Sequence, residues 1–310
     1  MKFKYGIVVP HFNSLEGLTR LLNSLPERSD IQVVIVDDKS AQPPCEETLH
    51  AAFPHLALQL FDNDSGTKGA GAARNIALQY IDATYTLFAD ADDFFTQQAF
   101  EQMDEKLAQH DITFFSPISQ CDLTGEPSDR HHLYANLVSE YLAKGDEEIR
   151  YHFSVPWSKV YLSDFIRRES LYFDAVIASN DVMFSLVAGY KAQSIAVHQN
   201  SIYCVTRGQG TLTVNFNPKV TRSRFDVAMR RIDYLSNKQI QTETASLYKL
   251  VRDFRAVLGT SELKHLFKLL VQRKITLMPK RTWFYLRNPQ QIITKLAKRK
   301  QSLSSAKYQV

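Results

Sequence analysis

The feature that most constrains this chain is an apolar segment, residues 84–89, that ends in three carboxylates. Asp90, Asp92 and Asp93 follow the segment within four positions, and apolar residues resume at Phe94. A short apolar run that ends in this way predicts a buried strand whose last residues emerge at an edge of a sheet. In open α/β sheets the carboxyl ends of the strands form the edge where ligands bind. The segment therefore predicts a strand with a functional site at its tip.

Three like charges this close together repel one another unless a positive group lies among them. Carboxylate oxygens suit Mg²⁺ or Mn²⁺, with the phosphates of a substrate completing the coordination shell. Asp90 and Asp92 are therefore the candidate metal ligands. The alternative is that these aspartates form a solvated turn that caps the next helix.

Strand and helix patterns alternate before this segment. Strands are expected at residues 3–10, 31–36 and 56–61, and helices at 15–25 and 69–82. Alternation of this kind predicts a mainly parallel sheet with right-handed crossovers and flanking helices, an α/β fold. The strand at 31–36 also ends in paired carboxylates, Asp37 and Asp38, so two strand ends place acidic groups at one edge.

The helix expected at 69–82 begins with the small residues Gly69-Ala70-Gly71-Ala72-Ala73. This is not a dinucleotide-binding fingerprint, because Arg74 occupies the last position and the segment lies well past the first strand. Small residues here let a helix pack closely against the sheet or a ligand. Lys68 and Arg74 flank the segment and are candidates for holding a phosphate at the helix N-terminus. Taken singly, either one fits a solvated surface cation equally well.

Four segments together resemble the successive motifs of family 2 glycosyltransferases, enzymes with the nucleotide-sugar-binding GT-A fold. They match in order and spacing over roughly the first 100 residues, which is far more specific than any one motif. The segments are VVPHFN at 8–13, VIVDDKS at 34–40, GAARN at 71–75 and FADADD at 88–93.

The resemblance implies a role for each matching position. Pro10, Asn13 and Asp38 would border the nucleoside, with the Asp38 carboxylate accepting a hydrogen bond from the base. Asp37 is included among the nucleotide-sugar-binding residues, and Arg74 would lie beside the nucleotide. The pair Asp90 and Asp92 would hold the metal and the ribose. Lys39 stands where many relatives have glycine, which alters the nucleotide edge but not the overall assignment.

A second region resembles the acceptor half of bacterial surface-polysaccharide members of the family. In those enzymes a Trp-x-Lys segment leads to a Glu-Asp pair; here Trp157-Ser158-Lys159 leads to Asn180-Asp181. The glutamate is missing, so only Asp181 carries over, and the resemblance implies that it is the catalytic base. From the residues alone, Asp181 also fits a carboxylate that stabilises the first turn of a helix.

Charge is distributed unevenly along the chain. Residues 219–310 contain 21 Lys and Arg against 5 Asp and Glu, and residues 263–310 contain 12 basic residues and no acidic one. Amphipathic helical patterns fill this region, and its last part adds Trp283, Phe284 and Tyr285. A basic amphipathic segment with aromatic residues is typical of helices that lie on an anionic membrane surface. The alternative is a helical appendage that packs on the catalytic domain and has a solvated basic face.

Sequence composition indicates the cellular compartment in which the protein is expected. No stretch approaches the roughly 20 apolar residues that span a membrane, and the N-terminus lacks signal-peptide features. Three cysteines at scattered spacings indicate neither a disulfide framework nor a zinc site. We expect a cytoplasmic protein, peripheral at the inner face of the cytoplasmic membrane.

These observations predict a GT-A catalytic domain at 1–217, with a nucleotide-binding half at 1–117 and an acceptor half at 118–217, and a basic helical region at 218–310. The expected activity is inverting, metal-dependent transfer of a sugar from a nucleotide-diphosphate donor, expected to be a UDP-sugar. The expected acceptor is a glycan or lipid-linked saccharide in surface polysaccharide synthesis, and no nucleic acid is expected as a partner. Two alternatives stay open: a haloacid-dehalogenase-like phosphatase, and a non-enzymatic basic adaptor for membrane or nucleic acid.

Overall fold

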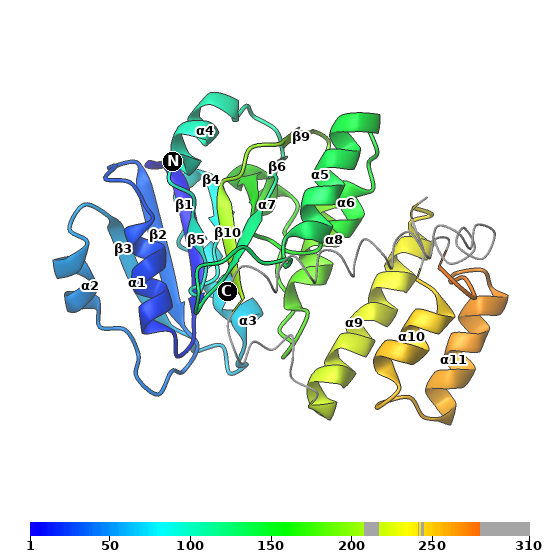
Figure 1. Cartoon of the computed structure of the whole chain (residues 1–310). Coiled ribbons are helices and arrows are strands. Elements are labelled where there is room, and N and C mark those ends of the chain that lie inside the picture. The colour runs from blue at the N-terminus through cyan, green and yellow to red at the C-terminus, as the bar shows by residue number, and fades with distance from the viewer. Residues whose placement is uncertain (208–216, 241, 243–244, 280–310) are drawn as a thin grey trace, which may run out of the picture. The chain divides into compact units, whose positions relative to one another are not determined.

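The computed structural model describes residues 1–207, 217–240, 242 and 245–279 (Figure 1). The chain forms two compact units, Met1–Val227 and a second unit that begins at Ala228. The division falls inside helix α9 (Pro218–Asn237). The domain limits expected at 217/218 stay a prediction.

A seven-stranded sheet forms the centre of the first unit, in the order β3-β2-β1-β4-β8-β6-β9. Neighbouring strands are parallel except β8, which runs antiparallel to both β4 and β6. The α/β fold with a mainly parallel sheet, expected from the sequence, is therefore confirmed. The strands are β1 (Phe3–His11), β2 (Ile31–Asp37), β3 (Ala57–Asp62), β4 (Ala83–Phe88), β6 (Ile112–Phe115), β8 (Lys159–Leu162) and β9 (Ile195–His198).

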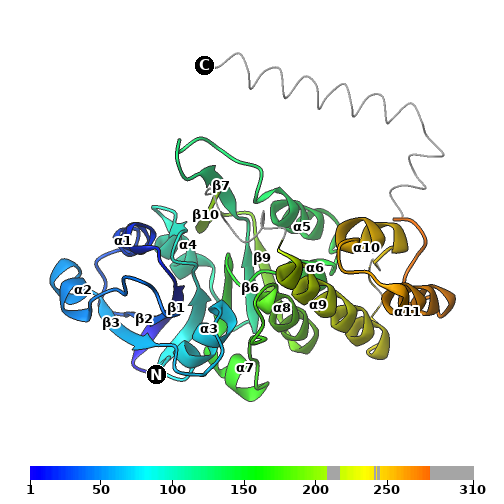
Figure 2. The same ribbon diagram turned by 90° about the horizontal axis from the view of Figure 1, so that it is seen from below.

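Helices cover both faces of this sheet. Figure 2 shows α1 and α4 on one face and α3 and α7 on the other. In α1 the side chains of Leu18, Leu21 and Leu22 recur at helical spacing and are almost wholly buried, so the apolar stripe faces the sheet. The helices of this unit are α1 (Leu15–Asn23), α2 (Glu46–Ala52), α3 (Ala70–Leu78), α4 (Ala99–Lys106), α5 (His132–Lys144), α6 (Ile149–His152), α7 (Ser163–Arg168) and α8 (Asn180–Lys191).

A small second sheet begins with the strand that directly follows the aspartate segment. Its strands are β5 (Phe94–Phe95), β10 (Tyr203–Arg207) and β7 (Ile118–Cys121), in the order β5-β10-β7. β10 pairs antiparallel with β5 and parallel with β7. This pairing brings residues more than 100 positions away in the sequence against Asp90–Asp93, which a local sequence pattern does not predict.

An aromatic cluster ties the tip of β4 to α8. The rings of Phe173 and Phe184 stack at 4.0 Å, and Phe88 contacts both edge-on at 5.0 and 5.3 Å. Tyr161 of β8 completes the cluster, 5.5 Å from Phe88. Aromatic packing of this kind is rigid and geometrically specific. It fixes the strand that leads to Asp90 relative to the helix that begins just before Asp181.

The second unit contains the C-terminal part of α9 together with α10 (Leu247–Phe254) and α11 (Thr260–Val271). Ser246 caps α10 by accepting a 3.3 Å hydrogen bond from the backbone N–H of Lys249. Within the described parts of the chain, no helix has the length and apolar character needed to cross a bilayer. Residues Trp283, Phe284 and Tyr285, singled out in the sequence, lie outside the described residues.

Candidate active site

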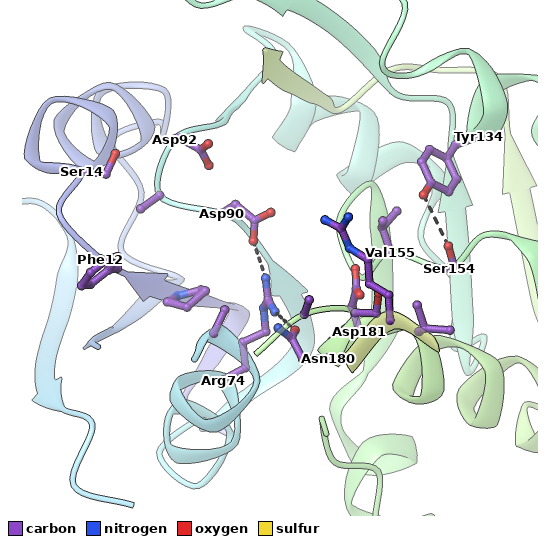
Figure 3. Close-up of a pocket in the computed structure, with 17 residues that line it drawn as sticks. Phe12, Ser14, Arg74, Asp90, Asp92, Tyr134, Ser154, Val155, Asn180 and Asp181 are labelled. Atoms are coloured by element: carbon purple, nitrogen blue, oxygen red, sulfur yellow. Dashed lines mark hydrogen bonds and ion pairs between the residues drawn. The ribbon is translucent and has the colours of Figure 1, made fainter. Parts of the chain in front are cut away.

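A pocket of about 610 Å³ opens at the carboxyl ends of β1 and β4 (Figure 3). Five residues predicted from the sequence line it together: Pro10, Arg74, Asp90, Asp92 and Asp181. They come from four separate segments of the chain, which the fold brings to one edge of the sheet. The other lining residues are Phe12, Ser14, Ala70, Ala91, Tyr134, Ser154, Val155, Ala178, Ser179, Asn180, Val182 and Arg224.

The acidic loop after β4 is held from outside by β10. The backbone N–H of Asp90 donates a 2.8 Å hydrogen bond to the hydroxyl oxygen of Tyr203. The carboxylate of Asp93 accepts from the backbone N–H of Thr206 at 2.7 Å, and the Thr206 hydroxyl donates to the carbonyl of Asp92, also at 2.7 Å. These bonds explain why Asp93 is buried whereas Asp90 and Asp92 stay at the pocket.

The electrostatics of the loop favour a cation. Carboxylate oxygens of Asp90, Asp92 and Asp93 lie within 4.8 Å of one another. Burial, and then repulsion from Asp90, raise the pKa of Asp92, and burial raises the pKa of Asp93 well above its usual range. Such shifts mean that the loop is short of positive charge, although Arg20 and Arg130 partly offset it. A divalent ion with oxygen ligands fits this donor set.

Arg74 stands between the acidic loop and α8. Its side chain is 5% exposed, its Nη2 pairs with the carboxylate of Asp90, and its Nη1 donates a 2.8 Å hydrogen bond to Oδ1 of Asn180 (Figure 3). The guanidinium carbon lies 5.2 Å from the ring centre of Phe173, a cation–π contact. Of the two readings of Arg74, the solvated surface cation does not fit a side chain that is almost fully buried.

Gly71 permits this close approach of α3 to the segment before α8. A Cβ atom at Gly71 would lie 2.2 Å from the carbonyl oxygen of Asp174 and 2.8 Å from Cβ of Asn180. Contacts that short do not occur, so any side chain here would push α3 away. The small residues of the 69–73 segment therefore bring Arg74 to Asn180.

Asp181 occupies the first turn of α8, opposite the acidic loop. Its pKa is raised to about 6, chiefly by burial, while the positive charge of Arg74 acts in the opposite direction. The neighbouring wall of the pocket is formed by Tyr134 and Ser154, whose hydroxyl oxygens lie 3.4 Å apart. A carboxylate in this setting is basic enough to accept a proton near neutral pH.

Lys159 of the Trp-Ser-Lys segment is buried beneath the acceptor side. Its side chain is 2% exposed, and Nζ donates a 2.7 Å hydrogen bond to the carbonyl of Phe153. Burial lowers the pKa of Lys159 well below its usual range, and its positive charge acts to lower the pKa of Asp181. Lys159 therefore influences the pocket through the protein interior rather than by lining it.

The paired carboxylates after β2 have different surroundings. Both oxygens of Asp37 are engaged: Oδ1 by His11 Nδ1 at 2.7 Å, and Oδ2 by the backbone N–H of Ser40 at 2.9 Å. The Ser14 N–H donates to Nε2 of His11 at 3.2 Å, so the proton of this imidazole sits on Nδ1 and points at Asp37. These bonds, those of Ser40 above all, hold the pKa of Asp37 low despite its burial.

Asp38 keeps more of its hydrogen-bonding capacity. Its Oδ1 accepts a 2.6 Å bond from the amide of Asn63, the only side-chain donor that the described residues give it. Asn13 has φ of 50°, and its Oδ1 accepts from the backbone N–H of Ala41 at 2.8 Å. Asn13 lines a neighbouring pocket that shares Ser14 and Asp92 with the first. Asp37 and Asp38 line neither, and their nucleotide-binding roles stay predictions.

Lys68 lies just before the N-terminus of α3 and is not part of the buried cluster around Arg74. Its ammonium group is 3.8 Å from the ring centre of Phe12, a residue that lines the pocket. Lys68 is exposed and precedes α3, whereas Arg74 is buried within that helix. Their joint role in holding a phosphate stays a prediction.

Several residues at the site were not predicted. Tyr203, Thr206, Arg20 and Arg130 all act on the acidic loop, yet they come from distant segments with no motif of their own. The one local signal was the departure of Asn180 from the Glu-Asp pair of relatives, which marked the position but not its contact with Arg74.

Comparison with known proteins identifies the family. The family model "Glycosyl transferase family 2" matches residues 6–168, more than half of the chain. Among curated proteins, the poly(ribitol-phosphate) beta-N-acetylglucosaminyltransferase TarS of Staphylococcus aureus is 24% identical over 218 residues, covering 67% of this chain and 36% of TarS. The uncharacterized glycosyltransferase EpsJ of Bacillus subtilis is 26% identical over 222 residues, covering 67% of this chain and 62% of EpsJ. The chain thus spans less than two thirds of either relative.

Solved structures support the same fold. TarS residues 1–349 in complex with UDP-GlcNAc superpose with a TM-score of 0.54 at 21% identity, covering 74% of this chain and 66% of that one. The mannosyltransferase PcManGT of Pyrobaculum calidifontis, in complex with GDP-Man and Mn²⁺, superposes with a TM-score of 0.53 at 14% identity, covering 86% and 71%. The GT-A-like architecture, the ordered motifs and the family match agree: the chain belongs to glycosyl transferase family 2.

Proposed function

We propose that this protein transfers a sugar from a nucleotide-diphosphate donor to a hydroxyl group of a glycan or lipid-linked acceptor, with inversion at the anomeric carbon. The observation that carries the proposal is the single pocket that contains the acidic loop, Arg74 and Asp181. One side of this pocket suits a phosphorylated leaving group and the other suits proton removal from an acceptor.

The donor side would be formed by Asp90, Asp92 and Arg74. The carboxylates fit Mn²⁺ or Mg²⁺ because three of them converge. Burial and mutual repulsion disfavour the charged form of Asp92, and a bound cation would stabilise that form. When bound there, the metal would neutralise charge on the diphosphate leaving group. Arg74 would bind the same diphosphate: its buried Nε–H has no hydrogen-bond partner in the described part of the chain, so a donor is left for an anion. Pro10, Asn13 and Asp38 are the proposed nucleoside side, and Asp37 and Lys68 are proposed as further nucleotide-sugar-binding residues, Lys68 at a phosphate.

The acceptor side would depend on Asp181. With its pKa near 6, this carboxylate is ionised at neutral pH and can take the proton from the attacking hydroxyl. Direct attack on the face of the sugar opposite the leaving group inverts the anomeric centre, so an α-linked donor gives a β-linked product. The proposal needs no covalent intermediate and therefore no protein nucleophile.

The relatives support a choice of donor and acceptor to test first. TarS, by its name, transfers N-acetylglucosamine to poly(ribitol-phosphate), and its structure was solved with UDP-GlcNAc. A UDP-sugar and a surface-polymer acceptor are therefore our first choices. The structural neighbour PcManGT was solved with GDP-Man, so a GDP-sugar belongs in the same test. Membership of family 2 argues against the phosphatase and the non-enzymatic adaptor.

The test is a donor panel. Purified protein is incubated with UDP-GlcNAc, UDP-Glc and GDP-Man, each with Mn²⁺, Mg²⁺ or a chelator, and release of the nucleotide and the anomer of the product are followed. We expect turnover of one UDP-sugar, dependent on metal, with a β-linked product from an α-linked donor. Turnover that is unaffected by excess chelator would contradict the metal site, and an α-linked product would contradict inversion.

We also propose that the protein works at the inner face of the cytoplasmic membrane, where a lipid-linked acceptor would be confined. The support from sequence is the run of 12 basic residues without an acidic one in 263–310. Each such residue near an anionic leaflet contributes about 1 kcal/mol, so a few together suffice for reversible binding.

A further inference from the structure

Helix α11 has two apolar faces, and only one of them is buried. Leu266 and Leu269 are 0% and 2% exposed and belong to the interior of the second unit. Leu263, Phe267 and Val271 are instead 47%, 63% and 67% exposed. Because they recur every four residues, these three side chains lie in a row along one side of the helix. We call this set the α11 row.

Single exposed apolar side chains are ordinary, whereas a continuous row marks a contact surface. Lys264 and Lys268, both exposed, each follow a member of the row by one position, so they border it along its length. The only acidic residue of the helix is Glu262, and its carboxylate accepts the backbone N–H of Gly259 at 2.9 Å, which caps the helix N-terminus. Negative charge is therefore confined to the N-terminal end of α11.

We propose that the α11 row docks on an anionic phospholipid surface, with the apolar side chains at the boundary between headgroups and acyl chains and the flanking lysines at lipid phosphates. An apolar row bordered by lysines is the arrangement of helices that lie in the plane of a membrane interface. Lysine suits this position because its aliphatic part stays with the apolar row while its ammonium group reaches the phosphates.

Charge decides between a lipid surface and other occupants. Residues 263–279 contribute Lys264, Lys268, Arg273 and Lys274 and no acidic side chain. Glu262 directly precedes Leu263, but its carboxylate accepts the backbone N–H of Gly259, and Lys274 lies 3.5 Å from Asp233. Lys264 and Lys268 are therefore the basic residues adjacent in sequence to the row. The positive charge beside the row would not strengthen binding to a purely apolar groove, whereas it would strengthen binding to an anionic leaflet.

A second exposed pair in the same unit is consistent with the proposal. Tyr248 and Leu277 are 51% and 52% exposed, and the backbone N–H of Tyr248 donates a 3.2 Å hydrogen bond to the carbonyl of Leu277. A tyrosine beside an aliphatic residue is a common combination at membrane interfaces. The second unit thus exposes Tyr248 and Leu277 in addition to the α11 row.

The experiment is co-sedimentation of the full chain with vesicles of pure phosphatidylcholine or of phosphatidylcholine with phosphatidylglycerol. One variant replaces the row (Leu263→Ser, Phe267→Ser, Val271→Ser) and a second reverses the flanking charge (Lys264→Glu, Lys268→Glu). A matched control, Leu142→Ser with Lys144→Glu, changes an exposed leucine and lysine on α5 of the first unit. Circular dichroism verifies the fold of each protein. Because every variant keeps residues 280–310, binding by that segment alone is not removed.

We expect binding to the anionic vesicles that weakens as salt rises, little binding to neutral vesicles, and an unchanged control. Each α11 variant should bind more weakly by at least about tenfold. Wild-type binding by both variants would overturn the proposal, because residues outside the α11 row would then account for it. Absence of vesicle binding, with self-association that the row variant abolishes, would also overturn it and identify a second copy of the chain as the occupant. None of these outcomes depends on the proposed sugar transfer.

Discussion

Arg74 donates a 2.8 Å hydrogen bond from Nη1 to Oδ1 of Asn180 while its Nη2 pairs with the carboxylate of Asp90. One buried side chain thus connects the proposed metal loop to the residue beside the proposed base. An asparagine here satisfies the guanidinium without adding charge, so the positive charge of Arg74 remains available to Asp90, to Asp181 and to a bound diphosphate. Relatives with the Glu-Asp pair would place a second carboxylate at this position.

Asn180→Asp tests that relationship. The added carboxylate should attract Arg74 and repel the charge on Asp181, which raises the pKa of Asp181. We expect the acidic limb of kcat/KM against pH to move upward by on the order of one pH unit. Asn180→Ala removes the hydrogen bond without adding charge, and should lower the rate while leaving the limb in place. Identical pH profiles for the two variants would show that Asn180 has only a packing role.

The pH dependence of the native enzyme should reflect Asp181. Since the carboxylate acts as a base only when ionised, and its pKa is about 6, kcat/KM should fall as the pH drops below that value. Asp181→Asn should reduce the rate by about 10²–10⁴-fold and abolish this limb, while the affinity for the nucleotide changes little. Loss of nucleotide affinity in the same proportion as the rate would contradict the role as base.

The same substitution should stabilise the fold near neutral pH. Burial raises the pKa of Asp181, so the folded state disfavours the charged form, and this penalty is present above about pH 6 and disappears as the pH falls. We expect Asp181→Asn to increase the free energy of unfolding by about 1–3 kcal/mol at pH 7.5, and to have no effect near pH 4. Urea denaturation at both pH values measures the difference. A large loss of stability at pH 7.5 would instead show that the Asp181 carboxylate mainly stabilises the first turn of α8.

Asp92→Asn should remove metal binding without unfolding the protein. The side chain lies at a strand end, and its charge is disfavoured by burial and by Asp90, so its neutralisation relieves repulsion. Excess Mn²⁺ should stabilise the native chain, by about 2.7 kcal/mol at a hundredfold excess over Kd, and should not stabilise the variant. Asp129→Asn, whose side chain is 69% exposed, is the control. Equal stabilisation of both variants would place the metal elsewhere.

Gly71→Ala tests the packing that places Arg74. The new methyl group would meet the Asp174 carbonyl at 2.2 Å, so α3 or the facing segment must move. Overpacking of this size destabilises proteins by about 1–3 kcal/mol. We expect a lower Tm together with weaker nucleotide binding. Gly145→Ala meets no atom within 4 Å and is strained only by its φ of 69°, so it should lower the Tm without affecting the nucleotide.

The sequence determined the strands that carry the acidic residues. β1, β2 and β4 were predicted to within one or two residues at each end, because continuous apolar runs are buried on both faces of a parallel sheet. Helix α5 was not predicted, since most of its residues remain at least partly exposed and it lacks a strong apolar stripe. Strand β8 is four residues long, and its antiparallel position between β4 and β6 is a matter of long-range pairing.

The site divides in the same way. Local sequence patterns already made Asp90, Asp92 and Arg74 candidates, and the resemblance in motif order added Asp181. Only the tertiary structure decided that Arg74 bonds Asn180, 106 residues away, and that Thr206 holds the loop from 113 residues beyond Asp93. Such contacts depend on how β10, α3 and α8 pack around the sheet. A local pattern fixes which face a side chain occupies, whereas its partner across the fold is set by the packing of the whole unit.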